Sequence, residues 1–205
     1  PSDLEGYAGG LTTGLEFDWS YVFTNLFFEG TWNASKVVGD PCQISATNEY
    51  YLQTEIGKDF SVCNFCIRPY LGFGFDRFEN IQEPKTAALC YQYDKLFIPI
   101  GGYVTWRNCK DLWTLQFEWR PDVWSNLDLL SINLDPDWGY GFRAQLIYNT
   151  QLSTRFGCFY LNWVPFFDWN RFGKIKEKNS SEAVMEIPAL TRWYLGLRFI
   201  VEYKF

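Results

Sequence analysis

The sequence predicts an all-β fold, an up-and-down antiparallel transmembrane β-barrel, from three observations. Large apolar residues recur at every second position through most of the 205 residues, which gives each stretch one apolar face and one polar or small face. The connections between these stretches alternate between short and long, as they do in bacterial membrane barrels. Aromatic residues make up 20% of the chain, which suits a lipid-facing wall bounded by two aromatic girdles.

The first two predicted strands form a hairpin. Strand one covers Leu11–Phe23 and places on one face Leu15, Phe17, Trp19, Tyr21 and Phe23. The phase of the alternation changes at Thr24–Asn25, and the outward residues are then Leu26, Phe28, Gly30 and Trp32. Because a tight turn that changes the phase is what a hairpin requires, we place the turn at Thr24–Asn25.

The alternation predicts seven further strands. They cover Asn48–Lys58, Phe65–Phe78, Lys95–Arg107, Trp113–Arg120, Trp138–Asn149, Phe159–Trp169 and Trp193–Phe205. The short turns fall at 59–64, 108–111 and 150–154, and the long loops at 34–47, 79–94, 121–137 and 170–188. Tryptophans gather at the strand ends, where amphipathic rings favour a membrane–water boundary. They are Trp19, Trp106 and Trp113 on the turn side, and Trp32, Trp119, Trp138, Trp169 and Trp193 on the loop side.

Three prolines lie within predicted strands, at Pro69, Pro99 and Pro165. Proline cannot donate a hydrogen bond to a strand ladder, so each should mark a strand end or a bulge. Pro69 and Pro165 fall near predicted ends, whereas Pro99 has no such explanation in the sequence.

The last strand alternates to its final residue, and its outward residues are Trp193, Leu195, Leu197, Phe199, Val201, Tyr203 and Phe205. This resembles the closing strand of small Gram-negative outer-membrane β-barrels, whose terminal Phe and alternating apolar residues mark the chain for barrel assembly. The stretch Arg68–Gly74, which reads Arg-Pro-Tyr-Leu-Gly-Phe-Gly, is similar to a Pro-Tyr-x-Gly-x-Gly strand of the same barrels. The resemblance covers nearly the whole chain. It implies an outer-membrane location, membrane lipid and the barrel-assembly machinery as partners, and an assembly signal at Phe199, Val201, Tyr203 and Phe205.

The number of strands raises a question of parity. Nine strands are visible. The closing strand of such a barrel ends in the periplasm, and because neighbouring strands run in opposite directions, strand one then also runs from the outside toward the periplasm. We therefore expect residues 1–205 to be a single barrel domain that lacks an upstream tenth strand. The alternative is an eight-stranded barrel in which residues 1–23 have another role.

The inward positions collect charges of both signs. The predicted lumen network comprises Glu16, Asp18, Glu29, Glu55, Arg68, Asp76, Arg107, Glu118, Arg120, Arg143, Arg198 and Glu202. A barrel of eight to ten strands is only just wide enough for its own side chains, and unpaired buried charge is costly. We therefore expect these charges to pair and to fill a narrow lumen. A path for ions or small solutes is the alternative.

Composition excludes several functions. The formal net charge is −6 without a basic run, which argues against nucleic-acid binding, and no run of eighteen apolar residues could form a transmembrane helix. The chain has no histidine, on which the known outer-membrane barrel enzymes rely, so we expect no enzyme activity. Cys63-Asn64-Phe65-Cys66 is a C-x-x-C motif, but no second pair completes a zinc site, so we expect neither a metal nor a cofactor.

The six cysteines fall on two sides of the predicted barrel. Cys42 and Cys90 lie in adjacent outer loops, and near the turns lie Cys63, Cys66, Cys109 and Cys158. An oxidising envelope compartment favours disulfides, with Cys42 paired to Cys90 and Cys63 or Cys66 paired to Cys109. Free thiols, or cross-links to other envelope proteins, are the alternatives.

These observations predict an integral, non-enzymatic component of the envelope with exposed loops and a narrow, charge-filled lumen. One alternative is a narrow porin-like channel for small solutes. Another is an adhesin or partner-binding barrel that acts through its long loops, above all residues 170–188. A soluble lipocalin-like barrel also alternates, but it would carry its apolar face inside.

Overall fold

The chain is all-β, and its class is confirmed. The computed structural model describes residues 4–37, 40–83, 91–108, 111–129, 132–134, 136–154, 157–178, 184–187, 189 and 191–203. Every regular element in these ranges is a strand, and every strand pairing is antiparallel. Across the same residues we find no helix with the length and apolarity needed to cross a membrane.

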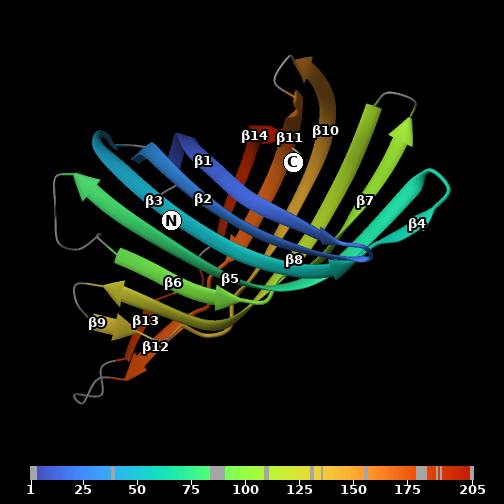
Figure 1. The fold of residues 1–205 in the computed structure, drawn as a ribbon. Coiled ribbons are helices and arrows are strands. Elements are labelled where there is room, and N and C mark those ends of the chain that lie inside the picture. Colours follow the sequence, from blue (N-terminus) through green and yellow to red (C-terminus); the bar gives the residue numbers. More distant parts are fainter. Residues whose placement is uncertain are drawn as a thin grey trace.

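The strands follow one another across a single large sheet (Figure 1). In chain order they are β1 Leu4–Trp19, β2 Val22–Val37, β3 Asp40–Lys58, β4 Phe60–Val62, β5 Phe65–Glu83, β6 Tyr91–Phe97, β7 Ile100–Asn108, β8 Asp111–Leu129, β9 Ile132–Leu134, β10 Tyr140–Thr154, β11 Gly157–Arg171, β12 Ile175–Lys178, β13 Val184–Ile187 and β14 Thr191–Tyr203. The pairing order is β1-β2-β3-β5-β6-β8-β10-β11-β14, with β4 and β7 continuing β3 and β6. This is the up-and-down order that the sequence predicts.

The sheet curls strongly about its long axis. Figure 1 shows β10, β11 and β14 lying behind β1, β2 and β3. The curl brings Arg198 of β14 within 2.6 Å of Glu29 of β2, although β3, β5, β6, β8, β10 and β11 lie between these two strands in the pairing order. We call the concave face of the sheet its interior. The turn end is the end with the connections at 20–21 and 63–64, and the loop end is the opposite one.

The two edges of the sheet are β1 and β14. Both run from the loop end toward the turn end, because both are odd members of an up-and-down series. Among the described residues no backbone pairing joins them. Closure of the sheet into a barrel, and a tenth strand antiparallel to both edges, therefore stay predictions.

The first hairpin turns earlier than predicted. Trp19 pairs with Val22, and the turn lies at Ser20–Tyr21 rather than Thr24–Asn25. Ser20 adopts a left-handed conformation with φ of 61°, as two-residue hairpin turns require. The shift places Phe23 on β2 and fully buried in the interior, so its predicted outward position was wrong. An aromatic residue on either face fits the alternation, so the pattern alone misplaced the turn.

All three prolines coincide with interruptions in the strand ladder. Pro99 separates β6 from β7, and its carbonyl accepts a hydrogen bond of 3.0 Å from the Gly72 amide. Pro69 lies opposite the break between β3 and β4. Pro165 lies in the middle of β11, where the pairing with β10 stops between Trp163 and Phe166. Proline has no backbone N–H to donate, and at each of these positions the ladder is interrupted, so no paired acceptor is left without its donor.

The strands extend far into the regions predicted as long loops. β2 and β3 stay paired as far as Val37 and Asp40, and β5 continues to Glu83. Beyond the main sheet, β12 and β13 form a separate hairpin, which Figure 1 shows near β9. An apolar cluster lies at this loop end. It consists of Phe78, Tyr93, Leu127, Leu134, Phe172 and Ile175. We call these six residues the cap cluster.

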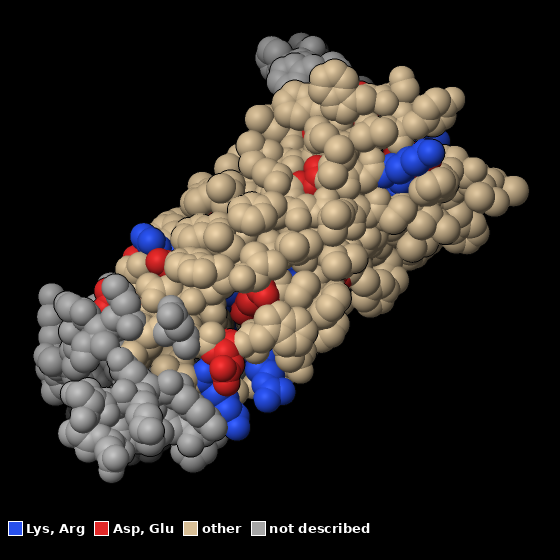
Figure 2. Space-filling view, turned by 90° about the horizontal axis from the view of Figure 1, so that it is seen from below, with Lys and Arg blue, Asp and Glu red and all other residues tan. Residues whose placement is uncertain are grey.

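The outer face of the sheet is apolar and exposed. Over much of the side shown in Figure 2 neither Lys, Arg, Asp nor Glu reaches the surface. The exposed apolar side chains come from every long strand, and they include Leu15, Phe17, Leu52, Ile56, Leu71, Phe73, Phe117, Phe142, Phe167, Leu195 and Leu197. The buried set has the opposite character, because charged and amide side chains make up much of it. The sheet is therefore inverted relative to a water-soluble protein, which buries its apolar residues.

Candidate functional site

A cluster of arginines and carboxylates lies across the centre of the interior. Asp168 of β11 accepts hydrogen bonds from Arg120 Nη2 at 2.5 Å and from Arg143 Nε at 2.7 Å. Glu29 of β2 accepts from Arg198 Nη2 at 2.6 Å and lies 3.5 Å from Arg143 Nη2. Arg143 thus bridges two carboxylates on opposite sides of the curl. We call these five residues the arginine cluster, and every buried charge in it has a partner of opposite sign, as burial requires.

A second interior group is built on Glu118 and Glu55. The Gln53 amide joins these carboxylates, because its Nε2 lies 2.6 Å from Glu118 and 2.7 Å from Glu55. The hydroxyl of Tyr70 donates to Glu118 at 2.7 Å, and that of Tyr103 donates to Glu55 at 2.9 Å. Buried carboxylates are stabilised by such donors, and Glu118 also lies 3.6 Å from Arg120 Nε. This group fills the section of the interior between the arginine cluster and the turn end.

Arg68 organises the turn end of the interior. Its guanidinium lies 2.7 Å from Asp59, 2.8 Å from Asp18 and 3.0 Å from Glu16. It also stacks on the Phe23 ring, with Cζ 4.1 Å from the ring centroid. Glu16 and Asp18 are exposed, since they lie on the edge strand β1. One half-buried arginine here ties β1, the β3–β4 break and β5 together.

Toward the loop end the charges alternate in sign. Lys95 Nζ lies 3.5 Å from Asp76, 3.9 Å from Asp122 and 2.9 Å from the Asn170 side-chain oxygen. Arg192 of β14 pairs with Glu49 of β3 and lies 3.7 Å from Asp76. Both Asp122 oxygens and one Asp76 oxygen are buried without a hydrogen-bond partner in the described part of the chain. Such orphaned acceptors favour water in this section of the interior.

The cap cluster lies directly over these charges. The Tyr93 and Phe172 rings pack edge to face, with centroids 4.6 Å apart. Arg192 Cζ lies 4.4 Å from the Phe78 centroid, and Lys95 Nζ lies 5.5 Å from that of Phe172. The cap cluster therefore places cations beneath aromatic faces, an arrangement that favours both partners.

The remaining residues of the predicted network have lesser roles. Arg107 is exposed near the turn end, and its backbone amide donates to the Asn64 carbonyl at 3.1 Å. Glu202 is half-buried and accepts from Asn162 at 3.3 Å. The structure therefore brings together Glu29, Arg120, Arg143 and Arg198 in one cluster, Glu55 with Glu118 in another, and Glu16 and Asp18 with Arg68 in a third.

Several interior residues lie outside the network that we derived from the sequence. They are Glu49, Lys95, Asp122, Asp168, Asn170 and Arg192. The alternation already places Asp168 between outward Phe167 and Trp169, so the same rule could have found it. Asp122 could not be found this way, because it lies in the predicted loop 121–137. The pairing of β8 with β6 determines on which face of the sheet Asp122 lies.

Two residues of the predicted assembly signal, Phe199 and Val201, lie on the outer face of β14. Phe199 and Val201 are exposed, and Phe199 packs edge to face on Trp163 with centroids 4.9 Å apart. Tyr203 pairs with Phe159 at the end of the strand, and Phe205 lies outside the described residues. The assembly role itself stays a prediction.

Two of the six cysteines have described side chains. Cys63 is exposed and Cys66 is half-buried, and both are free. Cys63 forms the hairpin turn before β5 with φ of 53°. The side chains of Cys42, Cys90, Cys109 and Cys158 lie outside the described residues, so the predicted pairing of Cys42 with Cys90 stays a prediction.

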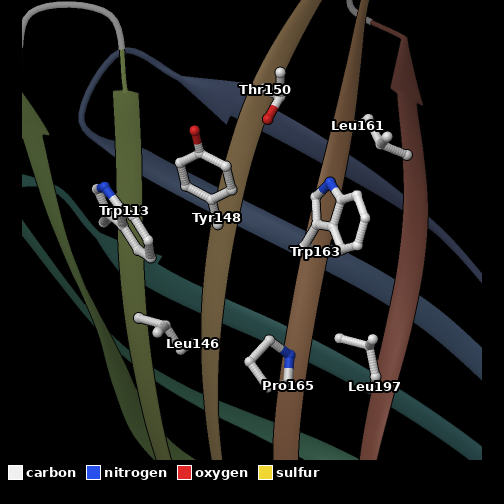
Figure 3. A pocket seen from close by; sticks show the side chains of 8 residues that line it. All are labelled: Trp113, Leu146, Tyr148, Thr150, Leu161, Trp163, Pro165 and Leu197. Atoms are coloured by element: carbon white, nitrogen blue, oxygen red, sulfur yellow. The ribbon is translucent and has the colours of Figure 1, made fainter.

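A separate feature lies on the outer face, where four strands form an apolar hollow of about 600 Å³ (Figure 3). Its lining comes from β8, β10, β11 and β14 and consists of Trp113, Leu146, Tyr148, Thr150, Leu161, Trp163, Pro165 and Leu197. One lining residue is Pro165, where the ladder between β10 and β11 is interrupted. No charged side chain lines it.

Among the described residues no three His, Cys, Asp or Glu side chains are grouped to hold a metal ion. The interior carboxylates instead bind arginine, lysine, amide and phenol groups. No protein-family model matches the chain, and no curated protein matches it in sequence. The function is therefore inferred from the arrangement of its residues.

Proposed function

We propose that this protein is an integral outer-membrane β-barrel of the envelope, without enzyme activity and with a lumen filled by paired charges. The observation that carries the proposal is the opposite character of the two faces of one sheet. Leu52 and Leu71 on the outer face are 43% and 52% exposed, whereas the Glu118 and Arg120 side chains inside are at most 1% exposed. Lipid is the solvent that this polarity suits.

The height of the outer apolar band supports a membrane location. On β2 the stretch from Val22 to Trp32 matches the roughly 9–11 residues with which a tilted strand crosses a bilayer. Trp19 lies at one end of this band and Trp32 at the other, both exposed. Trp and Tyr rings favour the membrane–water boundary, and such a band between two aromatic rows is typical of membrane barrels. The strand extensions past Trp32 then lie outside the bilayer.

The interior contacts support a lumen that conducts poorly. Arg143 lies between Glu29 and Asp168, with Tyr51 stacked on its guanidinium at 4.6 Å. These side chains come from β2, β3, β10 and β11, so they span the interior from side to side. A passing solute would have to displace buried ion pairs, which is costly.

Insertion into vesicles tests the membrane location. The refolded protein is mixed with phosphatidylcholine vesicles, washed with carbonate at high pH and floated on a density gradient. We expect it to float with the vesicles and to resist the wash. Leu71→Arg, on the outer face, should lower the stability of the inserted protein by about 2–4 kcal/mol if the site lies near the bilayer midplane.

Lys58→Arg is the matched control, because Lys58 is already charged and exposed at the turn end of β3. It should insert as the unsubstituted protein does. A protein that stays in the aqueous fraction as a folded monomer without detergent would exclude the proposal.

A narrow channel is the second candidate, and one observation favours it. The unpartnered oxygens of Asp76 and Asp122 are acceptors that water or a hydrated cation would satisfy. They lie beside Lys95, whose Nζ is 3.5 Å from Asp76 and 3.9 Å from Asp122. Conductance in planar bilayers separates this candidate from the filled barrel.

A further inference from the structure

The two edge strands carry long rows of unpaired backbone groups. β1 pairs with β2 alone, over Leu4–Trp19, and β14 pairs with β11 alone, over Thr191–Tyr203. Along an edge strand, every second residue directs its N–H and C=O away from the sheet, and among the described residues no strand meets them there. Hydrocarbon offers no replacement for these hydrogen bonds. The group that matches such an edge is another extended polypeptide.

The direction of the edges decides how that polypeptide pairs. β1 and β14 both run from the loop end to the turn end. A direct pairing of the two would be parallel, whereas a single strand between them is antiparallel to both, which is the slightly more stable arrangement per residue. One strand that runs from the turn end to the loop end therefore satisfies both edges. We call it the inserted strand.

The outer residues of the inserted strand are apolar. On β1 its neighbours on this face are Leu15 and Phe17, and on β14 they are Leu195 and Val201, all exposed. Leu195, at 76%, is the most exposed large apolar side chain of the described residues, because no strand lies beside it. A residue between these two rows meets the same lipid as they do. The inserted strand therefore continues their alternation of apolar and polar positions.

The inward residues of the inserted strand are basic near the turn end. The Glu16 and Asp18 side chains of β1 are 48% and 67% exposed, and they share the Arg68 guanidinium with Asp59. Three carboxylates thus meet one cation, and two of the three lie on the edge strand. Opposite charges on neighbouring strands stabilise a sheet, so Lys or Arg fits the inserted strand beside Glu16 and Asp18.

Farther from the turn end its inward residues are small. Around the curl, β1 and the space beside it lie between β14 and β2, and the Arg198 side chain crosses this space to reach Glu29. Thr12 of β1 is the register partner of Glu29 and marks the level of the contact. A large inward side chain at this level would overpack against the ion pair.

We propose that β1 and β14 together form a receiving site for one β-strand of a second polypeptide. No stretch outside the described ranges is longer than 84–90, and a strand needs roughly 9–11 residues to cross a bilayer, so these 205 residues hold no strand for the site. A covalent link to β1 is not required, because the contact of Arg198 with Glu29 already holds the two edges in place. The inference rests on the proposed membrane location and adds a partner to it.

Peptide binding to the full 205-residue chain in phosphatidylcholine vesicles tests the site. The probe is a peptide of about 11 residues with Leu or Val at alternate positions. The two positions between them that are nearest its N-terminus hold Lys, and the others hold Gly or Ser. At a peptide concentration about tenfold above Kd, amide hydrogen exchange in β1 and β14 should slow about tenfold. A diazirine at the N-terminus of the peptide should label the turn end, and one at its C-terminus the loop end.

Matched charge changes test the recognition. Asp18→Lys should weaken binding of the Lys peptide about fivefold and strengthen binding of a peptide with Glu in place of Lys by the same factor, which roughly 1 kcal/mol gives. Glu79→Lys, on β5 and away from both edges, should change neither affinity. A peptide of the same composition without the alternation should not slow exchange in β1 or β14.

Three results would overturn the site. The Lys peptide could leave exchange in β1 and β14 unchanged, the Lys and Glu peptides could bind equally, or protein without peptide could cross-link into dimers through β1 and β14, which would make a second copy the occupant. Each is read from protein that floats with the vesicles. Protein that fails to float would instead overturn the membrane location, so the two failures are distinguishable.

Discussion

Arg198 of the last strand donates hydrogen bonds through Nη2 to both carboxylate oxygens of Glu29, at 2.6 and 2.9 Å. The Arg198 side chain also lies over the Phe166 ring, with Cζ 3.8 Å from the centroid. Both charged side chains are 13% exposed. This contact joins β14 to β2 across the interior, where the edges β1 and β14 have no backbone pairing in the described residues. It is therefore one of the side-chain contacts that hold the two sides of the curled sheet together.

Arg198→Met should lower the free energy of unfolding by about 3 kcal/mol, because it leaves the buried Glu29 carboxylate with a single cation, Arg143, at 3.5 Å. Urea unfolding of vesicle-inserted protein, followed by tryptophan emission, measures the change. The double variant Glu29→Gln with Arg198→Met should cost less than the sum of the single changes, because it leaves neither partner charged and alone.

Arg77→Met is the control for this prediction. The Arg77 side chain is 40% exposed, and it pairs with Asp94 at 2.8 Å near the loop end. The Asp94 side chain is only 11% exposed, but it keeps a hydrogen bond of 2.9 Å from Gln92, and the Arg77 end of the pair is open to water. The loss should therefore be smaller than for Arg198→Met, about 1 kcal/mol. Equal costs for Arg198→Met and Arg77→Met would show that the pair across the interior does not hold the curl.

Because its interior is filled, we predict that the wild-type protein does not conduct ions across a bilayer. Wild-type protein in planar bilayers should give no steps of porin size, because Arg143, Glu29 and Asp168 occupy the middle of the interior. Arg143→Ala removes the largest of these side chains and should produce small, cation-selective steps, since both carboxylates keep their charge. Arg171→Ala, an exposed change on the same strand as Asp168, should stay silent. Large steps from the wild type would establish an open pore instead.

Alternation in the sequence was enough to predict the strand order and the face of most residues. It assigns Glu55, Glu118 and Arg143 inward, and all three are buried. It does not say which inward residues meet, because that depends on how far the sheet curls. The contact of Arg198 with Glu29 joins residues 169 positions apart, and nothing local in either strand encodes it.

The errors of the sequence analysis have physical causes. The turn at Ser20–Tyr21 was misplaced because Tyr21 and Phe23 are aromatic and suit either face equally. Residues 79–94 were predicted to be a loop, yet β5 continues to Glu83 and β6 begins at Tyr91. Strands that leave the apolar band no longer need an apolar outer face. Their alternation then disappears although their pairing continues.

Gly74→Ala should destabilise the protein by about 1–3 kcal/mol through overpacking. A methyl group at Gly74 would clash with the Phe97 ring, which is fully buried and stacked on Tyr51 with centroids 5.4 Å apart. The ring therefore has no free direction in which to move. Thermal unfolding of the inserted protein measures the loss.

Gly9→Ala gives the matched comparison on β1. No atom lies within 4 Å of a Cβ at Gly9, so the change should be neutral or slightly stabilising, because alanine restricts the unfolded chain. A neutral result at both positions would mean that the ring of Phe97 does not fill the interior as tightly as this geometry requires.

Phe172→Ala should loosen the cap cluster while leaving the sheet folded. Phe172 is 7% exposed and packs on Tyr93, and removing a buried phenyl ring costs about 3–5 kcal/mol locally. The loss falls on segments beyond the apolar band, so proteolysis of β9 and β12 in intact vesicles should become faster. The strands between Trp19 and Trp32 should stay protected, because their pairing does not involve Phe172. Val123→Ala, on the exposed outer face, should not change the proteolysis rate. A variant that loses protection everywhere at once would show that the cap cluster and the sheet unfold as one unit.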